Sequence, residues 1–458
     1  MDVLVPRSSV PGLAWPGLPG TAGVTMLALQ YQLEQSQWWP PDVVREQQFR
    51  QLQALLSHAC GTVPFYRDRL GEAGFAPDRP LTADIWARIP VLGRAEVQAA
   101  ETALFSTRVP AAHGKIHTLS TSGSTGRPVT VRGTAVAQAF WRAFTLRDHL
   151  WHRRDITKKL AVIRAVGEGQ ATYPKGAHAR YWGPSTASAF PNGPSAVLSI
   201  TTTVENQVLW LERENPEYLL NYPSNLLQLA RLYRERGMTL PNLRGIETFA
   251  EVLQPEVREA CREAWGVPVV DMYSAQETGY MAFQCPDHEH YHVQAESALV
   301  EVLNDQGSPC RPGETGRVVV TPLHNFATVL IRYEIGDFAE VGEACSCGRG
   351  LPVLRRIVGR ARNMLTLPSG DKMWPSFPAK LFLAIAPVKQ YQLIQRRPDE
   401  IELKLAVDET LTGDQEERLR EALNKRLGHP FAYRFTYVDE IPRSAGGKYE
   451  DFRVDLES

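Results

Sequence analysis

The chain has 458 residues, of which 43% are hydrophobic and 22% are charged, and its formal net charge is -1. These proportions describe an ordinary soluble globular protein, and the length favours two or three domains. A charge near zero supplies no general attraction for nucleic acid or for an anionic membrane, so a small molecule or another protein is the expected partner. No apolar run approaches the roughly 18 residues of a membrane span.

The N-terminal region combines a proline- and glycine-rich stretch with a later amphipathic pattern. It lacks the basic segment of a signal peptide, and we expect residues 1–25 to be disordered. Asp42 then follows two prolines and is predicted to cap a helix. The apolar face of this helix consists of Val44, Leu52, Leu55, Leu56 and Ala59. Such a face indicates a helix packed against a larger body.

The middle of the chain has the pattern of an α/β fold. Between residues 118 and 321, strand-like apolar runs alternate with helical stretches such as residues 221–236. After residue 359 the pattern restarts with predicted strands at 389–395, 400–407 and 433–438 and a helix at 414–427. We therefore expect a multi-layer α/β domain over residues 26–359 and a small α+β domain over residues 360–458.

A loop rich in small hydroxylated residues and glycine lies at the start of the α/β region. It contains Ser122, Gly123, Ser124, Thr125 and Gly126. Backbone N–H groups can crowd an anion where no Cβ intervenes, and the hydroxyls add donors, so the loop suits phosphates. It is not the common P-loop, because only two residues separate its glycines and Arg-Pro follows.

Further polar motifs follow this loop in a fixed order. They are residues 273–279, 313–317, 332–337, 357–360 and 441–448. This ordered set resembles the acyl-adenylating (AMP-forming ligase) superfamily. Residues 58–67 and the segment Cys345-Ser346-Cys347-Gly348-Arg349 are similar to the phenylacetate-CoA ligase branch, including its capsule-biosynthesis-type members. The resemblance runs from about Gln47 to Lys448.

The resemblance implies ATP-dependent, AMP-forming activation of a carboxylic acid. The loop at 122–126 would hold the β- and γ-phosphates, and Glu277 would bind Mg²⁺ beside them. Nucleotide contacts would come from Tyr273, Ser274, Asp337 and Arg360, with Asp337 on the ribose hydroxyls. Lys448, in a glycine-rich mobile loop, would place an ammonium between the carboxylate and the α-phosphate.

Two positions depart from the pattern of the superfamily. Many adenylating enzymes have lysine after the loop proline, whereas this chain has Val129. The phenylacetate-CoA ligase branch also lacks that lysine, so the change fits the branch. Lys448 is therefore the main candidate for the mobile cation. The resemblance also implies a hinge at residues 360–363, about which the small C-terminal domain is mobile, and an aspartate often stands there where this chain has Arg362.

The six cysteines include a group with the spacing of a zinc site. Cys285 lies in a histidine-rich segment about 60 residues before Cys345 and Cys347, and three thiols with one imidazole form a closed tetrahedral zinc set. The resemblance points to His292 as the fourth ligand, while spacing alone equally allows His288. A C-x-C pair cannot easily close into a disulfide, and no secretory signal is present, so we expect reduced thiols and a cytoplasmic location.

The acyl pocket is expected between the phosphate loop and Glu277. Aromatic candidates for its lining are Phe140, Trp141, Tyr222 and Tyr280. They favour an aryl or other hydrophobic acid. The adenylate could then be captured by the thiol of coenzyme A or of a carrier protein, or by an amine to give an amide. A third alternative is a non-catalytic nucleotide-binding relative.

Overall fold

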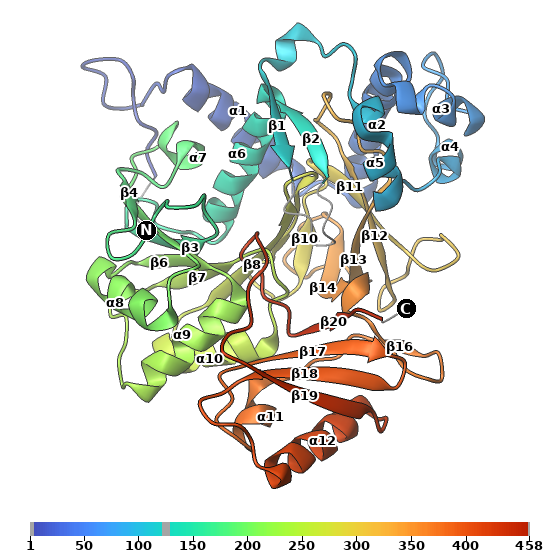
Figure 1. Cartoon of the computed structure of the whole chain (residues 1–458). Coiled ribbons are helices and arrows are strands. Elements are labelled where there is room, and N and C mark those ends of the chain that lie inside the picture. Colours follow the sequence, from blue (N-terminus) through green and yellow to red (C-terminus); the bar gives the residue numbers. More distant parts are fainter. Residues whose placement is uncertain (1–3, 121–128, 457–458) are drawn as a thin grey trace. The chain divides into compact units, whose positions relative to one another are not determined.

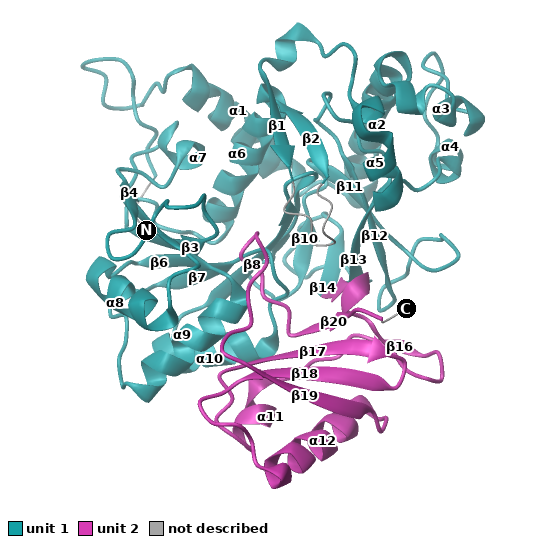
Figure 2. Ribbon diagram, viewed as in Figure 1, with its two compact units in different colours: residues 1–357 teal, residues 358–458 magenta. Residues whose placement is uncertain are grey.

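The chain divides into two compact units, residues 1–357 and 358–458 (Figure 2). The computed structural model describes residues 4–120 and 129–456. Sequence analysis predicts the division between residues 359 and 360. The segment predicted to be disordered contains the start of helix α1 (Thr21–Ser36), and the Arg7 N–H donates to the carbonyl of Ala189 at 2.7 Å. Its disorder in solution stays a prediction.

Helices dominate the first part of unit 1. After α1 they are α2 (Pro41–Thr62), η1 (Pro64–Tyr66), α3 (Arg69–Glu72), α4 (Ala83–Arg88), α5 (Arg94–Ala100), η2 (Glu101–Leu104) and η3 (Ala111–His113). The predicted apolar face of α2 is confirmed, since all five of its residues are buried. The predicted cap is wrong: Pro40 is the N-cap and Pro41, with its fixed φ, begins the helix, so Asp42 lies in the first turn.

A sheet of twelve strands, among the described residues, forms the centre of unit 1 (Figure 1). Its order is β11-β12-β13-β14-β10-β9-β8-β7-β6-β3-β5-β4. The strands of its second half are β3 (Leu160–Arg164), β4 (Ala177–Ala179), β5 (Ser195–Ser199), β6 (Tyr218–Asn221), β7 (Gly245–Thr248) and β8 (Val269–Ala275). From β5 to β8 they are parallel, and β4 is an antiparallel edge.

Helices connect the parallel strands, as crossover connections require. They are α7 (Pro184–Ala187), α8 (Val204–Glu214), α9 (Pro223–Glu235) and α10 (Pro255–Trp265), with α6 (Ala135–Trp151) preceding β3. The predicted α/β layering is confirmed. The helix predicted from residue 221 begins two residues later, because Asn221 completes β6 and Pro223 is compatible with a first helical position.

The other half of the sheet is antiparallel. It contains β9 (Gly279–Gln284), β10 (Tyr291–Val293), β11 (Ala298–Leu303), β12 (Thr315–Pro322), β13 (Tyr333–Val341) and β14 (Val353–Arg360). Its core cluster includes the α2 leucines Leu52, Leu55 and Leu56. A separate two-stranded sheet pairs β1 (Ile116–Ser120) with β2 (Thr130–Thr134).

Unit 2 is a small α+β body around the sheet β19-β18-β17-β20. Its elements are η4 (Ala361–Asn363), β15 (Leu365–Thr366), β16 (Lys372–Met373), α11 (Ala379–Leu383), β17 (Gln390–Arg397), β18 (Glu400–Ala406), α12 (Gly413–Leu427), β19 (Ala432–Val438) and β20 (Phe452–Val454). The three predicted strands and the helix are confirmed. A capping box of Thr412 and Gln415 starts α12, and Gly428 ends it in the left-handed conformation. Within the described ranges, no helix combines the length and apolar character needed to cross a bilayer.

Candidate functional site

The phosphate-loop residues Ser122, Gly123, Ser124, Thr125 and Gly126 lie outside the described residues. The strands on either side of the loop are described, and they pair as an antiparallel ladder up to Ser120 opposite Thr130. Val129, at the position of the lysine found in many adenylating enzymes, is 2% exposed and belongs to the core cluster around α2. A lysine in that environment would bury its charge, which accounts for an apolar residue there.

Glu277 lies in the turn that joins the last parallel strand, β8, to β9. It is half-buried, at the carboxyl end of the parallel strands, where open α/β sheets bind their ligands. The turn closes at Gly279, whose φ of +84° favours glycine. The local sequence therefore presents a carboxylate at this edge of the sheet. Ser274, at the end of β8, is also half-buried.

Asp337 and Tyr273, from two separate motifs, contact each other. Asp337 is in β13 and Tyr273 in β8, and both are largely buried. The Tyr273 hydroxyl donates a hydrogen bond to Asp337 Oδ2 at 2.7 Å. A hydrogen bond to an ionised carboxylate is about twice as strong as one between neutral groups, and it fixes the orientation of the acceptor. The structure thus joins two of the predicted nucleotide-binding residues.

We expect Tyr273→Phe to raise the KM for ATP about 10-fold with a smaller change in kcat, because a hydrogen bond to a charged group contributes about 1.5–3 kcal/mol. The measurement is acid-dependent pyrophosphate exchange at varied ATP concentration. Tyr291→Phe is the matched control, since the Tyr291 hydroxyl makes an equivalent 2.7 Å hydrogen bond to Asp271 Oδ2. An equal rise in the KM for ATP in both variants would show that Tyr273 has no specific role in ATP binding.

Three of the four predicted pocket residues belong to one apolar cluster. Phe140 and Trp141 on α6 pack with Tyr280 on β9. The rings of Trp141 and Tyr280 are 4.6 Å apart, and the Tyr280 hydroxyl is 3.1 Å from Thr145 Oγ1. Phe140 stacks on the ring of His324 at 3.5 Å. Burial lowers the pKa of His324 to about 3, so this ring is neutral near pH 7.

Tyr222 belongs to a different cluster. It is 2% exposed, packs in the core formed around α8, α9 and α10, and lies 4.6 Å from the ring of Phe249. Its hydroxyl accepts a hydrogen bond from the Ala165 N–H at 3.2 Å. The structure therefore does not place Tyr222 with the other three predicted pocket residues. His324, a residue that the pattern of aromatic positions could not reveal, takes part instead.

Lys448 and Arg360 both belong to unit 2. Lys448 lies in a tight loop between β19 and β20, where its N–H donates to Ser444 Oγ at 3.1 Å and its carbonyl accepts from the Ser444 N–H at 2.8 Å. The turn needs Gly447, whose φ is +77°. Arg360 ends β14, and its carbonyl accepts a hydrogen bond from Trp374 Nε1 at 3.1 Å.

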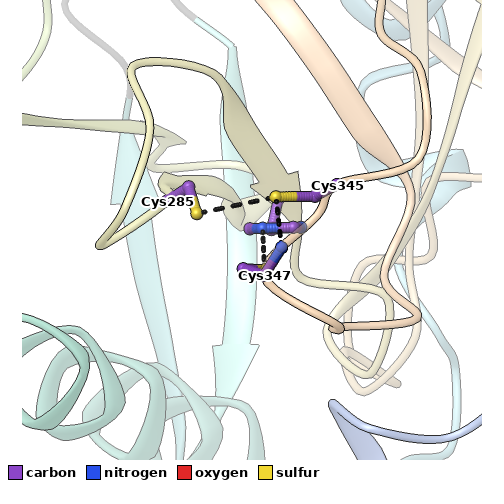
Figure 3. Close-up of side chains that lie close together, drawn as sticks. Cys285, Cys345 and Cys347 are labelled. Atoms are coloured by element: carbon purple, nitrogen blue, oxygen red, sulfur yellow. Dashed lines mark hydrogen bonds between the residues drawn. The ribbon is translucent and has the colours of Figure 1, made fainter.

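Cys285, Cys345 and Cys347 converge in unit 1 (Figure 3), and His292 belongs to the same cluster. Their ligand atoms all lie within 4.8 Å of one another, with 3.9 Å between the sulfurs of Cys285 and Cys345 and 3.3 Å between Cys347 Sγ and His292 Nε2. Thiolates about 2.3 Å from a tetrahedral ion stand roughly 3.8 Å apart, so this donor set fits zinc. His288, the alternative left open by spacing, is exposed and lies 3.0 Å from Ser346 Oγ.

The protonation of this cluster follows from burial and a neighbouring arginine. Burial lowers the pKa of His292 to about 4, which leaves a neutral imidazole, the form that binds metals. Burial opposes ionisation of Cys347, but hydrogen bonds and the charge of Arg349 outweigh it and lower the pKa of this thiol. All six cysteines of the chain are free thiols.

A second buried group of possible ligands, Asp148, His149 and Glu247, was not foreseen from the sequence. It already contains a cation, since Arg154 Nη1 contacts Asp148 Oδ2 and lies 2.9 Å from His149 Nδ1 and 3.5 Å from Glu247 Oε1. Burial raises the pKa of Glu247 well above its usual range, which leaves the group without an excess of negative charge. The guanidinium thus takes the place that an ion would need.

The chain is similar to known proteins in both sequence and structure. The family model of the CapK C-terminal domain matches residues 365–452. A phenylacetate-coenzyme A ligase of Thermus thermophilus is 27% identical over 451 residues, which cover 89% of this chain and 96% of the relative. Protein CapK of Staphylococcus aureus is 23% identical over 250 residues, which cover 52% of this chain and 53% of the relative.

Among solved structures, a 2-hydroxyisobutyryl-CoA ligase in its postadenylation state superposes with a TM-score of 0.71 and 20% identity, over 92% of each chain. This similarity confirms the predicted fold, a large α/β domain followed by a small α+β domain. The chain is therefore similar in sequence to phenylacetate-CoA ligases and to CapK, and it shares its fold with a solved acyl-CoA ligase.

Proposed function

We propose that the protein activates a carboxylic acid with ATP as an acyl adenylate and then transfers the acyl group to a thiol, that of coenzyme A or of a carrier protein. The observation that supports this most is similarity along nearly the whole chain to a phenylacetate-coenzyme A ligase, over 89% of this protein and 96% of the relative. Both units contribute residues of the proposed machinery, and an alignment that covers 89% of the chain extends into both.

The chemistry requires fixed positive charge at the phosphates. A carboxylate is a poor electrophile, and its attack on the α-phosphate of ATP converts the carboxyl oxygen into a leaving group, AMP, while pyrophosphate departs. Charge gathers on the phosphoryl oxygens in the transition state, where preorganised cations are most effective. In this proposal Lys448 supplies an ammonium at the α-phosphate, and residues 122–126 hold the β- and γ-phosphates.

The remaining polar residues bind and orient the nucleotide. Glu277 would hold Mg²⁺, which neutralises phosphate charge when bound. Asp337, oriented by Tyr273, would accept hydrogen bonds from the ribose hydroxyls, and Arg360 would contact the ribose or a phosphate. The half-buried Ser274, at the end of the same strand as Tyr273, would line the nucleotide site.

The acid is proposed to be an aryl or other hydrophobic carboxylic acid. Phe140, Trp141 and Tyr280 supply an aromatic surface on α6 and β9, beside the turn that carries Glu277. The neutral His324 ring stacked on Phe140 adds a further flat face. Flat aromatic walls of this kind suit planar apolar groups.

We also propose one structural zinc ion per chain, bound by Cys285, His292, Cys345 and Cys347. Four protein ligands leave no open coordination position, so the metal would stabilise the fold and take no part in catalysis. Protein purified without added zinc should contain close to one equivalent by metal analysis. His288→Ala should retain the metal and His292→Ala should lose it; the reverse result would make His288 the ligand.

We propose that the protein is cytoplasmic, because free thiols and a nucleotide substrate both fit this reducing compartment.

Acid-dependent ATP–pyrophosphate exchange tests the first half-reaction. With Mg²⁺ and a panel of aryl, hydroxy and alkyl acids, we expect exchange with at least one acid and trapping of its adenylate by hydroxylamine. Coenzyme A, a carrier protein and simple amines are then compared as acceptors, because an amide product would assign the protein to the amide ligases. ATP binding without exchange for any acid would favour a non-catalytic nucleotide-binding relative.

A further inference from the structure

Residues 360–363, at the end of β14 and just after it, are hydrogen-bonded to two other parts of unit 2. Trp374 Nε1 donates to the carbonyl of Arg360 at 3.1 Å, and Asn363 Nδ2 donates to the carbonyl of Phe452 at 2.9 Å. Gly359 precedes this segment with a φ of +143°, and a Cβ there would lie 3.2 Å from Trp374 Cδ1. Residues 360–363 are therefore part of the unit 2 body.

Arg362 adds an ion pair to these hydrogen bonds. Its Nη2 makes an ion pair with Glu450 Oε1, two residues after Lys448, and the two side chains are only 24% and 21% exposed. Partial burial strengthens such a pair, because water screens it less than a surface pair. An aspartate at position 362 of this chain would face the Glu450 carboxylate, so the arginine matches its partner in charge.

Glu450 is also held through its backbone. Its carbonyl accepts a hydrogen bond from Gln392 Nε2 on β17 at 2.9 Å, and β20 begins two residues later in parallel register with β17. On the other side of Lys448, the Arg443 guanidinium donates to the carbonyl of Gly447 at 3.1 Å. The backbone of the lysine loop is thus fixed at its base, while the Glu450 side chain links it to residues 360–363.

We propose that Arg362 and Glu450 are positioning residues for Lys448, an inference that rests on the proposed function. An ammonium that must meet both the carboxylate and the α-phosphate is effective only in a narrow range of positions. The ion pair restricts the loop to the conformations near that range. Without it, the loop samples more conformations, and a smaller fraction of molecules is competent for adenylation.

The test compares Arg362→Gln and Glu450→Gln with the charge-reversed double variant Arg362→Glu/Glu450→Arg. With phenylacetate, or the acid of the panel that gives the fastest exchange, each single variant should lower kcat for pyrophosphate exchange about 10-fold with little change in the KM for ATP. Transfer of the acyl group from supplied acyl adenylate to coenzyme A should change less than about 2-fold. The double variant should recover to within about 3-fold of the parent protein.

Arg396→Gln is the matched control. Arg396 pairs with Glu402 at 2.7 Å, with side chains 18% and 9% exposed, and with Asp455 at 2.7 Å in the same unit. The described contacts of Arg396 and Glu402 do not include residues 441–450. It should lower thermal stability and leave the ratio of the two half-reactions unchanged. If Arg396→Gln alters that ratio as much as Arg362→Gln does, or if the folded double variant stays as slow as the single variants, the positioning role is wrong.

Hydrogen exchange of the peptide 443–452 gives a readout that needs no acid. Its amides should exchange faster in both single variants and return to the parent rate in the double variant, with no change in Arg396→Gln. Unaltered exchange in the single variants would overturn the proposal even in an active enzyme. Absence of pyrophosphate exchange in the parent protein would instead contradict the proposed function. Failure of the positioning role and failure of the proposed function are therefore distinguishable.

Discussion

Replacing Lys448 by alanine is expected to slow adenylation about 100- to 1000-fold, with little change in ATP affinity, because a contact made mainly in the transition state contributes about 3–4 kcal/mol. Lys448 N–H and C=O are already hydrogen-bonded to Ser444, so the loop keeps its backbone geometry when the side chain is removed. The loss should therefore come from the ammonium and not from unfolding of the loop.

The second half-reaction separates two roles for this lysine. If Lys448 acts only at the α-phosphate, transfer from a chemically supplied acyl adenylate to coenzyme A should survive in Lys448→Ala. Lys425→Ala is the control, an exposed lysine in the last turn of α12 in the same unit, and it should leave both steps unchanged. An equal fall of both half-reactions would mean that Lys448 supports the fold or both steps.

The double variant Cys345→Ser/Cys347→Ser is expected to lose the proposed zinc ion and to unfold at a clearly lower temperature. The loss of a structural metal removes several kcal/mol, and each kcal/mol shifts the Tm of a unit of this size, residues 1–357, by roughly 1–2 °C, so a fall on the order of 5–10 °C is expected. Calorimetry and metal analysis of the same samples check both parts of the result.

Cys60→Ser serves as the control for this variant, because Cys60 is a half-buried free thiol outside the cluster. It should keep the metal and nearly the full Tm. A chelator should lower the Tm of the parent protein and of Cys60→Ser alike, and have little effect on the double variant. Retention of a full equivalent of zinc by the double variant would show that the ligand set is wrong.

Much of the architecture could be predicted from local patterns. The strands and helix of unit 2 follow from alternating and helical apolar periods, and the turn residues bound them where expected. Boundaries were less accurate where proline intervened: both Pro41 and Pro223 occupy the first turn of a helix, because the missing N–H has no intrahelical partner there.

Only some residues of the candidate site could be predicted from the sequence. The order of motifs along the chain predicted residues that the fold brings together, such as Tyr273 with Asp337. The buried group around Arg154 could not be predicted, because Asp148 and His149 on a helix have the same pattern as a solvated polar face. Tyr222 shows the opposite error, since an aromatic residue close to a strand end is as suited to a core as to a pocket.

The pairing of β10 with β14 has a consequence for synthesis of the protein on the ribosome. Tyr291 and His292 pair with Leu354 and Val353, and three other strands are made in between. Cys345 follows Cys285 by 60 positions, so at roughly 5–20 residues per second the first thiol waits some 3–12 seconds for its partners. During that interval the nascent chain presents an unpaired strand edge and a reactive sulfur. If the proposed zinc ion is bound, zinc scarcity or oxidants in the producing cell should reduce the yield of folded protein more than the specific activity of the molecules that do fold.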